Sequence, residues 1–224
     1  MIETFTETKE LMLRIRFLVS NGYVFYTKIQ SNKSKKNKLI YKFSDRYYVD
    51  ATKTKRDYAR RIGNANVTLI FDESEQSEML TFWLLATDGK GIVFDLEDMH
   101  DSRKKQSRIT ISNDSYELLR LPRPNDKARW TWVLTQEKYD YLLNEIKLAI
   151  RHKKDKTLRQ LHFKIVRIYG FSGMRKQGFA LLHYMRKEWI RVRKDDFPFN
   201  ESYIGYLKVA VKKKTKINDV TINK

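Results

Sequence analysis

Residues 80–87 read Leu-Thr-Phe-Trp-Leu-Leu-Ala-Thr, a run in which nearly every side chain is apolar. A short apolar run that ends in a turn such as Asp88-Gly89-Lys90-Gly91 is typical of a strand buried in the middle of a sheet. We therefore expect this stretch to be the central strand of a sheet formed by the N-terminal part of the chain.

The segments that precede this run also indicate strands. Residues 11–19 alternate loosely between apolar and basic side chains, which favours a strand. The pair Asn21-Gly22 is a strong signal for a tight turn between antiparallel strands, and the aromatic run 23–29 follows it. We therefore predict a hairpin of residues 11–19 and 23–29, and a further strand at 66–71.

Other short elements surround these strands. A helix is predicted at residues 52–62, because Thr52 or Thr54 can cap its start and Gly63 can end it. A short helix is expected at 39–43, polar loops at 31–38 and 95–106, and strands at 92–94, 108–111, 116–121 and 129–133. Many short strands with few helices predict an α+β domain on an antiparallel or mixed sheet, spanning residues 1–134.

From residue 135 the apolar period changes from two to 3.6, which indicates helices. We predict a helix from the N-cap Thr135 to about residue 151, a second at 157–168, and a third that Ser172 caps and that runs to about 194. Residues 135–224 are therefore expected to form a basic helical domain with a Lys-rich tail. The last two helices, joined by a short turn that contains Gly170, have the form of a helix-turn-helix.

The charge of the chain is strongly positive and unevenly distributed. The formal net charge is +19 with a pI of about 9.9. Residues 151–224 contain 20 Lys and Arg against 6 Asp and Glu, so this third of the chain carries most of the excess. Because a basic surface attracts polyanions, the distribution predicts that the C-terminal helices bind nucleic acid.

The predicted contact residues follow from the helical pattern. Ser172, Arg175, Lys176 and Gln177 open the third helix, where a helix-turn-helix protein contacts base edges. A second basic patch is expected on the helix at 52–62, and Lys212, Lys213 and Lys214 open the tail. The complete set is Lys153, Lys154, Lys156, Arg159, Lys164, Arg167, Ser172, Arg175, Lys176, Gln177, Arg186, Lys187, Arg191, Arg193, Lys194, Lys55, Arg56, Arg60, Arg61, Lys212, Lys213 and Lys214.

Two alternatives remain open. A structured RNA would be attracted by the same charges as DNA. A metal-dependent nuclease would need clustered carboxylates, and Asp95, Glu97, Asp98 and Asp101 lie close together in sequence around His100. No motif indicates a cofactor or another metal site, and the chain has no Cys for a zinc finger. These observations favour a binding protein over an enzyme.

The start of the chain shows no signal-peptide pattern, and no apolar run is long enough to cross a membrane. We therefore expect a cytoplasmic protein that does not bind membranes.

Four segments together resemble a group of small basic proteins encoded on bacterial plasmids and other mobile elements, a group without an assigned activity. The segments are residues 21–26 (Asn-Gly-Tyr-Val-Phe-Tyr), 58–67 (Tyr-Ala-Arg-Arg-Ile-Gly-Asn-Ala-Asn-Val), 82–89 (Phe-Trp-Leu-Leu-Ala-Thr-Asp-Gly) and 174–177 (Met-Arg-Lys-Gln). The chain departs from that group at Asp88 and Gly91, where the group has His. The resemblance implies an accessory protein for transfer, replication or transposition, with other mobile-element proteins as further partners.

Overall fold

The computed structural model describes residues 2–73, 78–123, 126–199 and 203–207. The described part is a mixed α+β structure whose first sheet has five strands in the order β1-β3-β4-β2-β5. β1 runs parallel to β3 and the other neighbours are antiparallel, so the sheet is mixed, one of the two arrangements that the sequence predicts. Its strands are β1 (Ile2–Phe5), β2 (Phe25–Asn32), β3 (Val67–Asp72), β4 (Met79–Ala86) and β5 (His100–Asp101).

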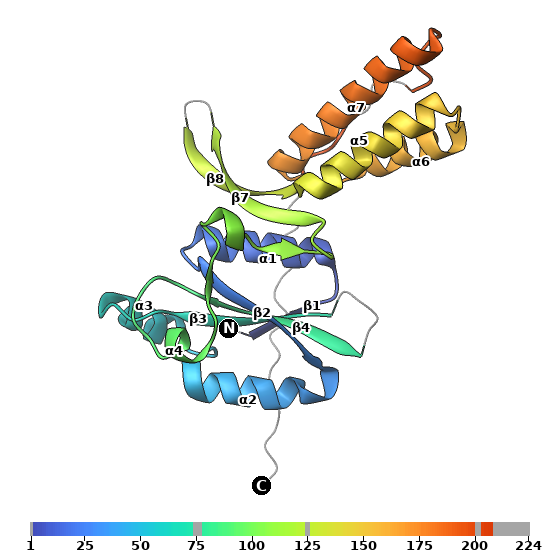
Figure 1. The fold of residues 1–224 in the computed structure, drawn as a ribbon. Helices are drawn as coiled ribbons and strands as arrows, with labels where there is room; N and C mark the ends of the chain where they lie inside the picture. The colour runs from blue at the N-terminus through green and yellow to red at the C-terminus, as the bar shows by residue number, and fades with distance from the viewer. Residues whose placement is uncertain (1, 74–77, 124–125, 200–202, 208–224) are drawn as a thin grey trace.

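β4 lies at the centre of this sheet because both of its faces are covered. Trp83 and Leu85 belong to a core cluster shared with α1 (Thr8–Ser20), whereas Phe82 and Leu84 belong to a second cluster shared with α2 (Lys36–Tyr47). Figure 1 shows these two helices on opposite sides of the sheet. A strand buried on both faces needs apolar side chains at every position, which explains the run at 80–87.

The predicted hairpin of residues 11–19 and 23–29 is wrong. Residues 11–19 lie in the helix α1, and its buried side chains follow a helical spacing: Leu11, Met12, Ile15, Leu18 and Val19. The sequence resembles a period-two pattern because the apolar Phe17 lies on the exposed side of this helix. Asn21 and Gly22, with φ of +93° at the glycine, end α1 and lead into β2.

The segments around α2 and β4 also correct two shorter predictions. Residues 31–38 are not a loop: β2 continues to Asn32, a 3-10 turn (Lys33–Lys35) follows, and α2 begins at Lys36. Residues 92–94 lead into the single-turn helix α4 (Val93–Leu96) instead of forming a strand. The helix expected at 52–62 is confirmed as α3 (Lys53–Arg61), and the side chain of Thr52 caps it.

A second, three-stranded sheet covers the other side of α1. It consists of β6 (Thr110–Ile111), β7 (Tyr116–Arg123) and β8 (Asp126–Leu134), in that order, and a 3-10 turn (Lys105–Ser107) precedes it. The indole nitrogen of Trp132 donates a hydrogen bond to the carbonyl of Met12, at 2.8 Å. α1 therefore lies between the two sheets (Figure 1).

Three helices follow β8: α5 (Gln136–Arg151), α6 (Asp155–Val166) and α7 (Ser172–Arg193). Thr135 caps α5, as predicted, and α6 begins two residues before the predicted Thr157. Ser172 is not the N-cap of α7: it is the first helical residue, and its hydroxyl contacts Thr131 instead. Figure 1 shows the three helices packed side by side and extending from the end of β8.

One core cluster connects these helices with the rest of the molecule. It contains residues of α1, β4, β7 and β8 together with residues of α5, α6 and α7. Buried apolar contacts therefore cross residue 134, and a division of the chain into two domains at that point stays a prediction. No helix among the described residues is both long and apolar enough to cross a membrane.

Candidate nucleic-acid interface

The basic residues of α6 and α7 fall into two classes, and the first is engaged in internal contacts. Glu188, the one carboxylate of α7, is buried and binds Arg151 at 3.0 Å and Arg191 at 2.6 Å. Arg193 pairs with Asp155 of α6, and the guanidinium of Arg167 lies 3.7 Å from the ring centroid of Phe163. Arg151 therefore connects α5 to α7 and Arg193 connects α7 to α6, whereas the contact of Arg191 lies within α7. The carboxylates of Glu188 and Asp155 neutralise part of this charge within the protein.

The second class forms an exposed stripe along α7. Lys176, Arg186 and Lys187 are exposed, and within the described residues no carboxylate lies within 4.0 Å of their charged groups. They recur at helical spacing on the side opposite the buried Met174, Leu181 and Met185. The stripe, which we call the α7 stripe, consists of Lys176, Phe179, His183, Arg186, Lys187 and Ile190.

α6 and the turn before it add further exposed cations. Lys156, Arg159 and Lys164 lie on the exposed side of α6, away from the buried Leu158 and Leu161. Lys153 and Lys154 stand in the turn between α5 and α6, and Lys194 follows α7. Lys212, Lys213 and Lys214 lie outside the described residues.

The first turn of α7 packs against the protein itself. The amide of Gln177 donates to the carbonyl of Leu134 at 2.9 Å and accepts from its backbone nitrogen at 2.7 Å. Arg175 donates to the carbonyl of Ile204 at 2.8 Å, and its guanidinium stacks on Tyr206, 3.4 Å from the ring centroid. Base contacts by Ser172, Arg175 and Gln177 stay a prediction, but these side chains already join α7 to β8 and to residues 203–207.

Glycine at position 173 permits this close packing. A Cβ atom there would lie 2.6 Å from a methyl carbon of Val133 and 2.7 Å from the carbonyl oxygen of Trp132. Contacts this short force the neighbours to move, so only glycine lets α7 begin directly on β8. The start of α7 is consequently fixed in position, and its exposed side is set by β8.

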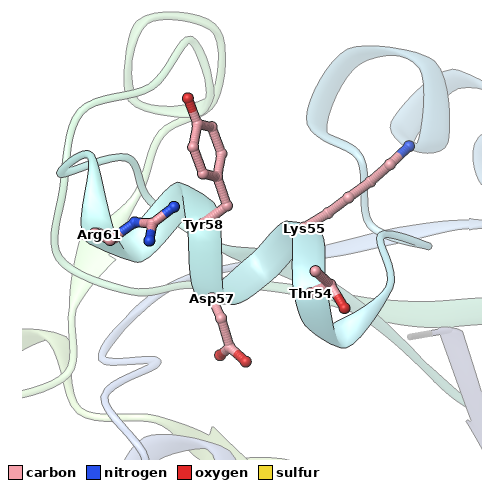
Figure 2. Close-up of a pocket in the computed structure, with 5 residues that line it drawn as sticks. All are labelled: Thr54, Lys55, Asp57, Tyr58 and Arg61. Carbon is pink, nitrogen blue, oxygen red and sulfur yellow. The ribbon is translucent and has the colours of Figure 1, made fainter.

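α3 forms the second basic surface expected from the sequence. Lys55, Arg60 and Arg61 are exposed, whereas Arg56 donates hydrogen bonds to the carbonyls of Val49 and Ala51 and to the hydroxyl of Tyr23. A hollow of about 580 Å³ lies against this helix. All of its lining residues come from α3 (Figure 2), so it is an exposed helix face and not a cleft between elements: Thr54, Lys55, Asp57, Tyr58 and Arg61.

The acidic residues at 95–101 do not converge on one point. Glu97 accepts a hydrogen bond from Tyr47 at 2.6 Å, and burial together with this carboxylate raises the pKa of Tyr47 to about 12. Asp98 lies 3.7 Å from His100. Within the described residues, no three His, Asp or Glu side chains are grouped so that they could hold a metal ion. The nuclease alternative therefore finds no support in this loop.

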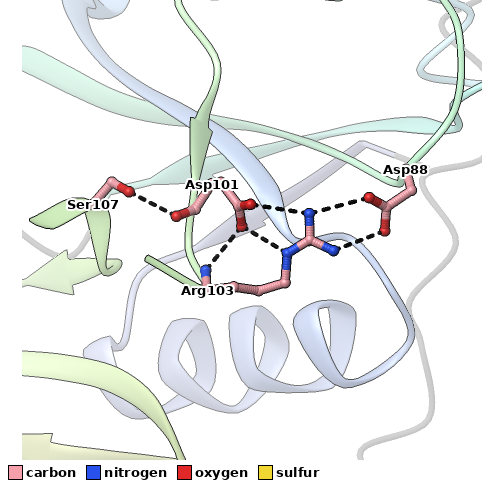
Figure 3. Close-up of polar contacts among 4 residues, drawn as sticks. All are labelled: Asp88, Asp101, Arg103 and Ser107. Atoms are coloured by element: carbon pink, nitrogen blue, oxygen red, sulfur yellow. Dashed lines mark hydrogen bonds and ion pairs between the residues drawn. The ribbon is translucent and has the colours of Figure 1, made fainter. Parts of the chain in front are cut away.

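Asp101 has a different partner from the other acids. Arg103 bridges it to Asp88, with contacts of 2.8 and 3.0 Å to Asp101 and of 3.1 and 3.2 Å to Asp88 (Figure 3). The hydrogen bonds from Arg103 lower the pKa of Asp101. The backbone carbonyl of Asp101 also accepts from Ser107 at 2.7 Å, so this cluster ties the 88–107 segment together.

A further group of basic residues is not predicted by the sequence pattern. Arg16 of α1, Arg120 of β7 and Arg129 of β8 line adjoining hollows beside Trp130. Because the pattern at 11–19 favours a strand, it does not place Arg16 next to β8. A helical interpretation would put Arg16 one turn after Met12, but the pairing of α1 with β8 depends on the tertiary fold.

Comparison of the chain with protein-family models, with curated proteins and with solved structures finds no match.

Proposed function

We propose that this protein binds nucleic acid, DNA in preference to RNA, through the exposed sides of α6 and α7. The observation that carries the proposal is the α7 stripe, where three cations face solvent without a carboxylate partner among the described residues. Arg151, Arg191 and Arg193 are paired with carboxylates inside the protein, whereas the cations of the stripe are not. The unpaired charge is therefore concentrated on one side of α7. The resemblance to mobile-element proteins suggests an accessory role in transfer, replication or transposition.

The dimensions of the stripe suit a nucleic-acid backbone. Lys176 and Lys187 are separated by eleven positions, which at about 1.5 Å per residue is roughly 17 Å of helix. Each cation that neutralises a phosphate releases condensed counterions, and this release supplies much of the binding free energy at low salt. The exposed cations of α6 and α3 would extend the contact to further phosphates.

The proposal keeps α6 and α7 as a helix-turn-helix-like pair but changes which part of α7 contacts the nucleic acid. The two helices have the expected order and a short connection, but the first turn of α7 is held against β8. We therefore assign the contact to the exposed length of α7, from Lys176 onward, and we expect it to contact phosphates more than base edges.

The test is a fluorescence anisotropy titration with duplex DNA at several salt concentrations. Wild-type binding should weaken steeply with salt, and replacing Lys176, Arg186 and Lys187 by Ala should lower the salt slope by about 0.9 for each phosphate that is no longer neutralised. A matched control replaces Lys90, Lys104 and Lys105, three exposed lysines of the 88–107 segment, and should leave the slope unchanged.

Two outcomes would contradict the proposal. Equal slopes for the wild type and the α7 variant would exclude the stripe as the contact surface. DNA and RNA carry the same backbone charge, so the stripe could bind either of them. If a structured RNA binds more strongly than duplex DNA in competition, the partner is RNA and not DNA.

A further inference from the structure

The β7–β8 hairpin, the C-terminal half of α1 and the turn before α7 border an open pocket that the proposed function does not use. It consists of two adjoining hollows of about 600 and 210 Å³, which share Arg16, Arg129 and Trp130. We call it the arginine pocket. Besides these three residues, the lining includes Phe17, Arg120, Phe171, Ser172 and Tyr206.

The charge of this pocket is entirely positive. Three arginines line it, and none of its lining residues is Asp or Glu. Arg129 pairs with Asp126 at 3.1 Å, and Arg120 donates one hydrogen bond to the carbonyl of Ala128. Arg16 is partly buried on the ring of Phe171, and in the described part of the chain no carboxylate lies within 4.0 Å of it.

A partly buried guanidinium without a counterion is unfavourable, because it is removed from water without gaining an anion. Burial accordingly lowers the pKa of Arg16. A bound anion such as a phosphate would compensate for this desolvation, and the planar guanidinium groups of Arg16 and Arg120 can each donate two hydrogen bonds to it. The pocket is therefore suited to an anionic ligand.

Aromatic side chains form the rest of the wall. Trp130 stands opposite Arg120 in the β7–β8 ladder, and it is the only one of the four tryptophans that is not buried. Phe17 is 56% exposed and Tyr206 is 68% exposed. Single exposed apolar side chains are common on protein surfaces, so the stacking surface is assigned to Trp130 and not to these two rings. Trp130 lines both hollows beside the arginines, so a partly exposed ring on which a base can stack lies next to an anion site.

We propose that the arginine pocket binds one unpaired nucleotide of a nucleic-acid strand, with its phosphate against Arg16 and Arg120 and its base against Trp130. The inference rests on the proposed function, because the nucleotide would belong to the strand held by the α7 stripe. It predicts that the protein prefers DNA with a single-stranded extension over blunt duplex. The preference would be tolerant of sequence, since every base has a flat face that can stack.

The first experiment measures Trp130 directly. Titration with a short oligothymidine should quench the intrinsic fluorescence, because Trp83, Trp132 and Trp189 are buried and only Trp130 can stack on a base. The quenching should disappear in Trp130→Phe. An oligoglutamate of the same charge serves as the competing anion, and equal quenching by both would overturn the assignment to a nucleotide.

The second experiment compares blunt duplex with the same duplex carrying a single-stranded extension of a few nucleotides. We expect the wild type to bind the extended duplex about tenfold more tightly. Arg16→Gln and Arg120→Gln should each remove most of that preference and leave blunt-duplex binding unchanged. Lys28→Gln, which removes an exposed cation from the ring of Trp83, is the charge-matched control and should keep the preference.

The outcomes separate the two proposals. Tight salt-dependent binding of both duplexes with equal affinity, and no quenching, would overturn the pocket assignment and leave the proposed function intact. Quenching by oligothymidine without any duplex binding would support the pocket and contradict the α7 stripe as a duplex contact. Circular dichroism would show whether Arg16→Gln fails to fold. In that case Arg120→Gln decides whether the pocket causes the preference for the extended duplex, because the side chain of Arg120 is exposed and its replacement does not disturb the core.

Discussion

Glu188 shows how a single residue can organise the basic C-terminal helices. It is buried, it lies between Arg151 of α5 and Arg191 of α7, and it accepts hydrogen bonds from both. The hydrogen bond from Arg191, followed by that from Arg151, lowers the pKa of Glu188, although burial opposes the shift. A carboxylate in this position stabilises the packing of α5 on α7 only while it is ionised.

We predict that Glu188→Gln lowers the free energy of unfolding by about 1–3 kcal/mol at pH 7, the usual effect of removing charge-assisted hydrogen bonds to a buried group. Because the folded pKa is lowered, this contribution is complete above the unfolded pKa of about 4.3 and is lost as the pH falls through the folded value. Urea unfolding should therefore show the stability difference between the wild type and the variant shrinking as the pH falls from 7 toward 3.

The control for this measurement is Glu137→Gln, which changes an exposed carboxylate of α5 and should have little effect. A difference between the wild type and Glu188→Gln that stays constant from pH 7 to pH 3 would contradict the assigned role.

At the scale of the element, α3 is held by very few contacts. None of its residues is buried, and five of its nine residues are Lys or Arg. Arg56 connects it to the preceding loop and to Tyr23 through three hydrogen bonds, and Asn66 donates to the carbonyl of Arg56 at 3.0 Å. An exposed helix with so few anchors opens more readily than the core.

We predict that Arg56→Ala increases amide hydrogen exchange in residues 53–61 by about tenfold or more, while exchange in the central strand β4 stays unchanged. Arg60→Ala is the matched control, because Arg60 is exposed and makes only a 3.9 Å contact with Asp57. Uniformly faster exchange throughout the molecule would mean instead that Arg56 supports the whole fold.

On the scale of the whole molecule, α1 connects the five-stranded sheet with the three-stranded sheet, and β8 connects that second sheet with the C-terminal helices. The core cluster around α1 continues without interruption from Trp83 of β4 through Trp132 of β8 to Trp189 of α7. Elements that share one packed core usually unfold together in a cooperative transition.

We therefore predict that the two parts of the chain on either side of residue 134 unfold together. Labelling with fluorotryptophan gives NMR signals that can be assigned by Trp→Phe variants, and in urea the signals of Trp83, Trp132 and Trp189 should disappear at the same midpoint. A lower midpoint for Trp189 alone would support a separate helical domain at residues 135–224.

Elements whose signals are local can be predicted from the residues alone. The helix at 52–62 and the cap at Thr135 follow from side chains that bond to neighbouring backbone, and the run at 80–87 follows from burial on both faces. The uneven charge also follows from the sequence, because it is a sum over residues. These properties need no knowledge of which segments meet.

Features that depend on contacts between distant segments follow from the folded structure and not from the sequence pattern. Residues 11–19 are apolar enough to suit either period, and contact with both sheets selected the helix. The same packing divided the basic residues into those that bind Glu188 and Asp155 and those that form the α7 stripe. It also brought Arg16, Arg120 and Trp130 to one pocket from distant parts of the chain. Sequence patterns report local preferences, whereas an interface forms where long-range burial brings segments together.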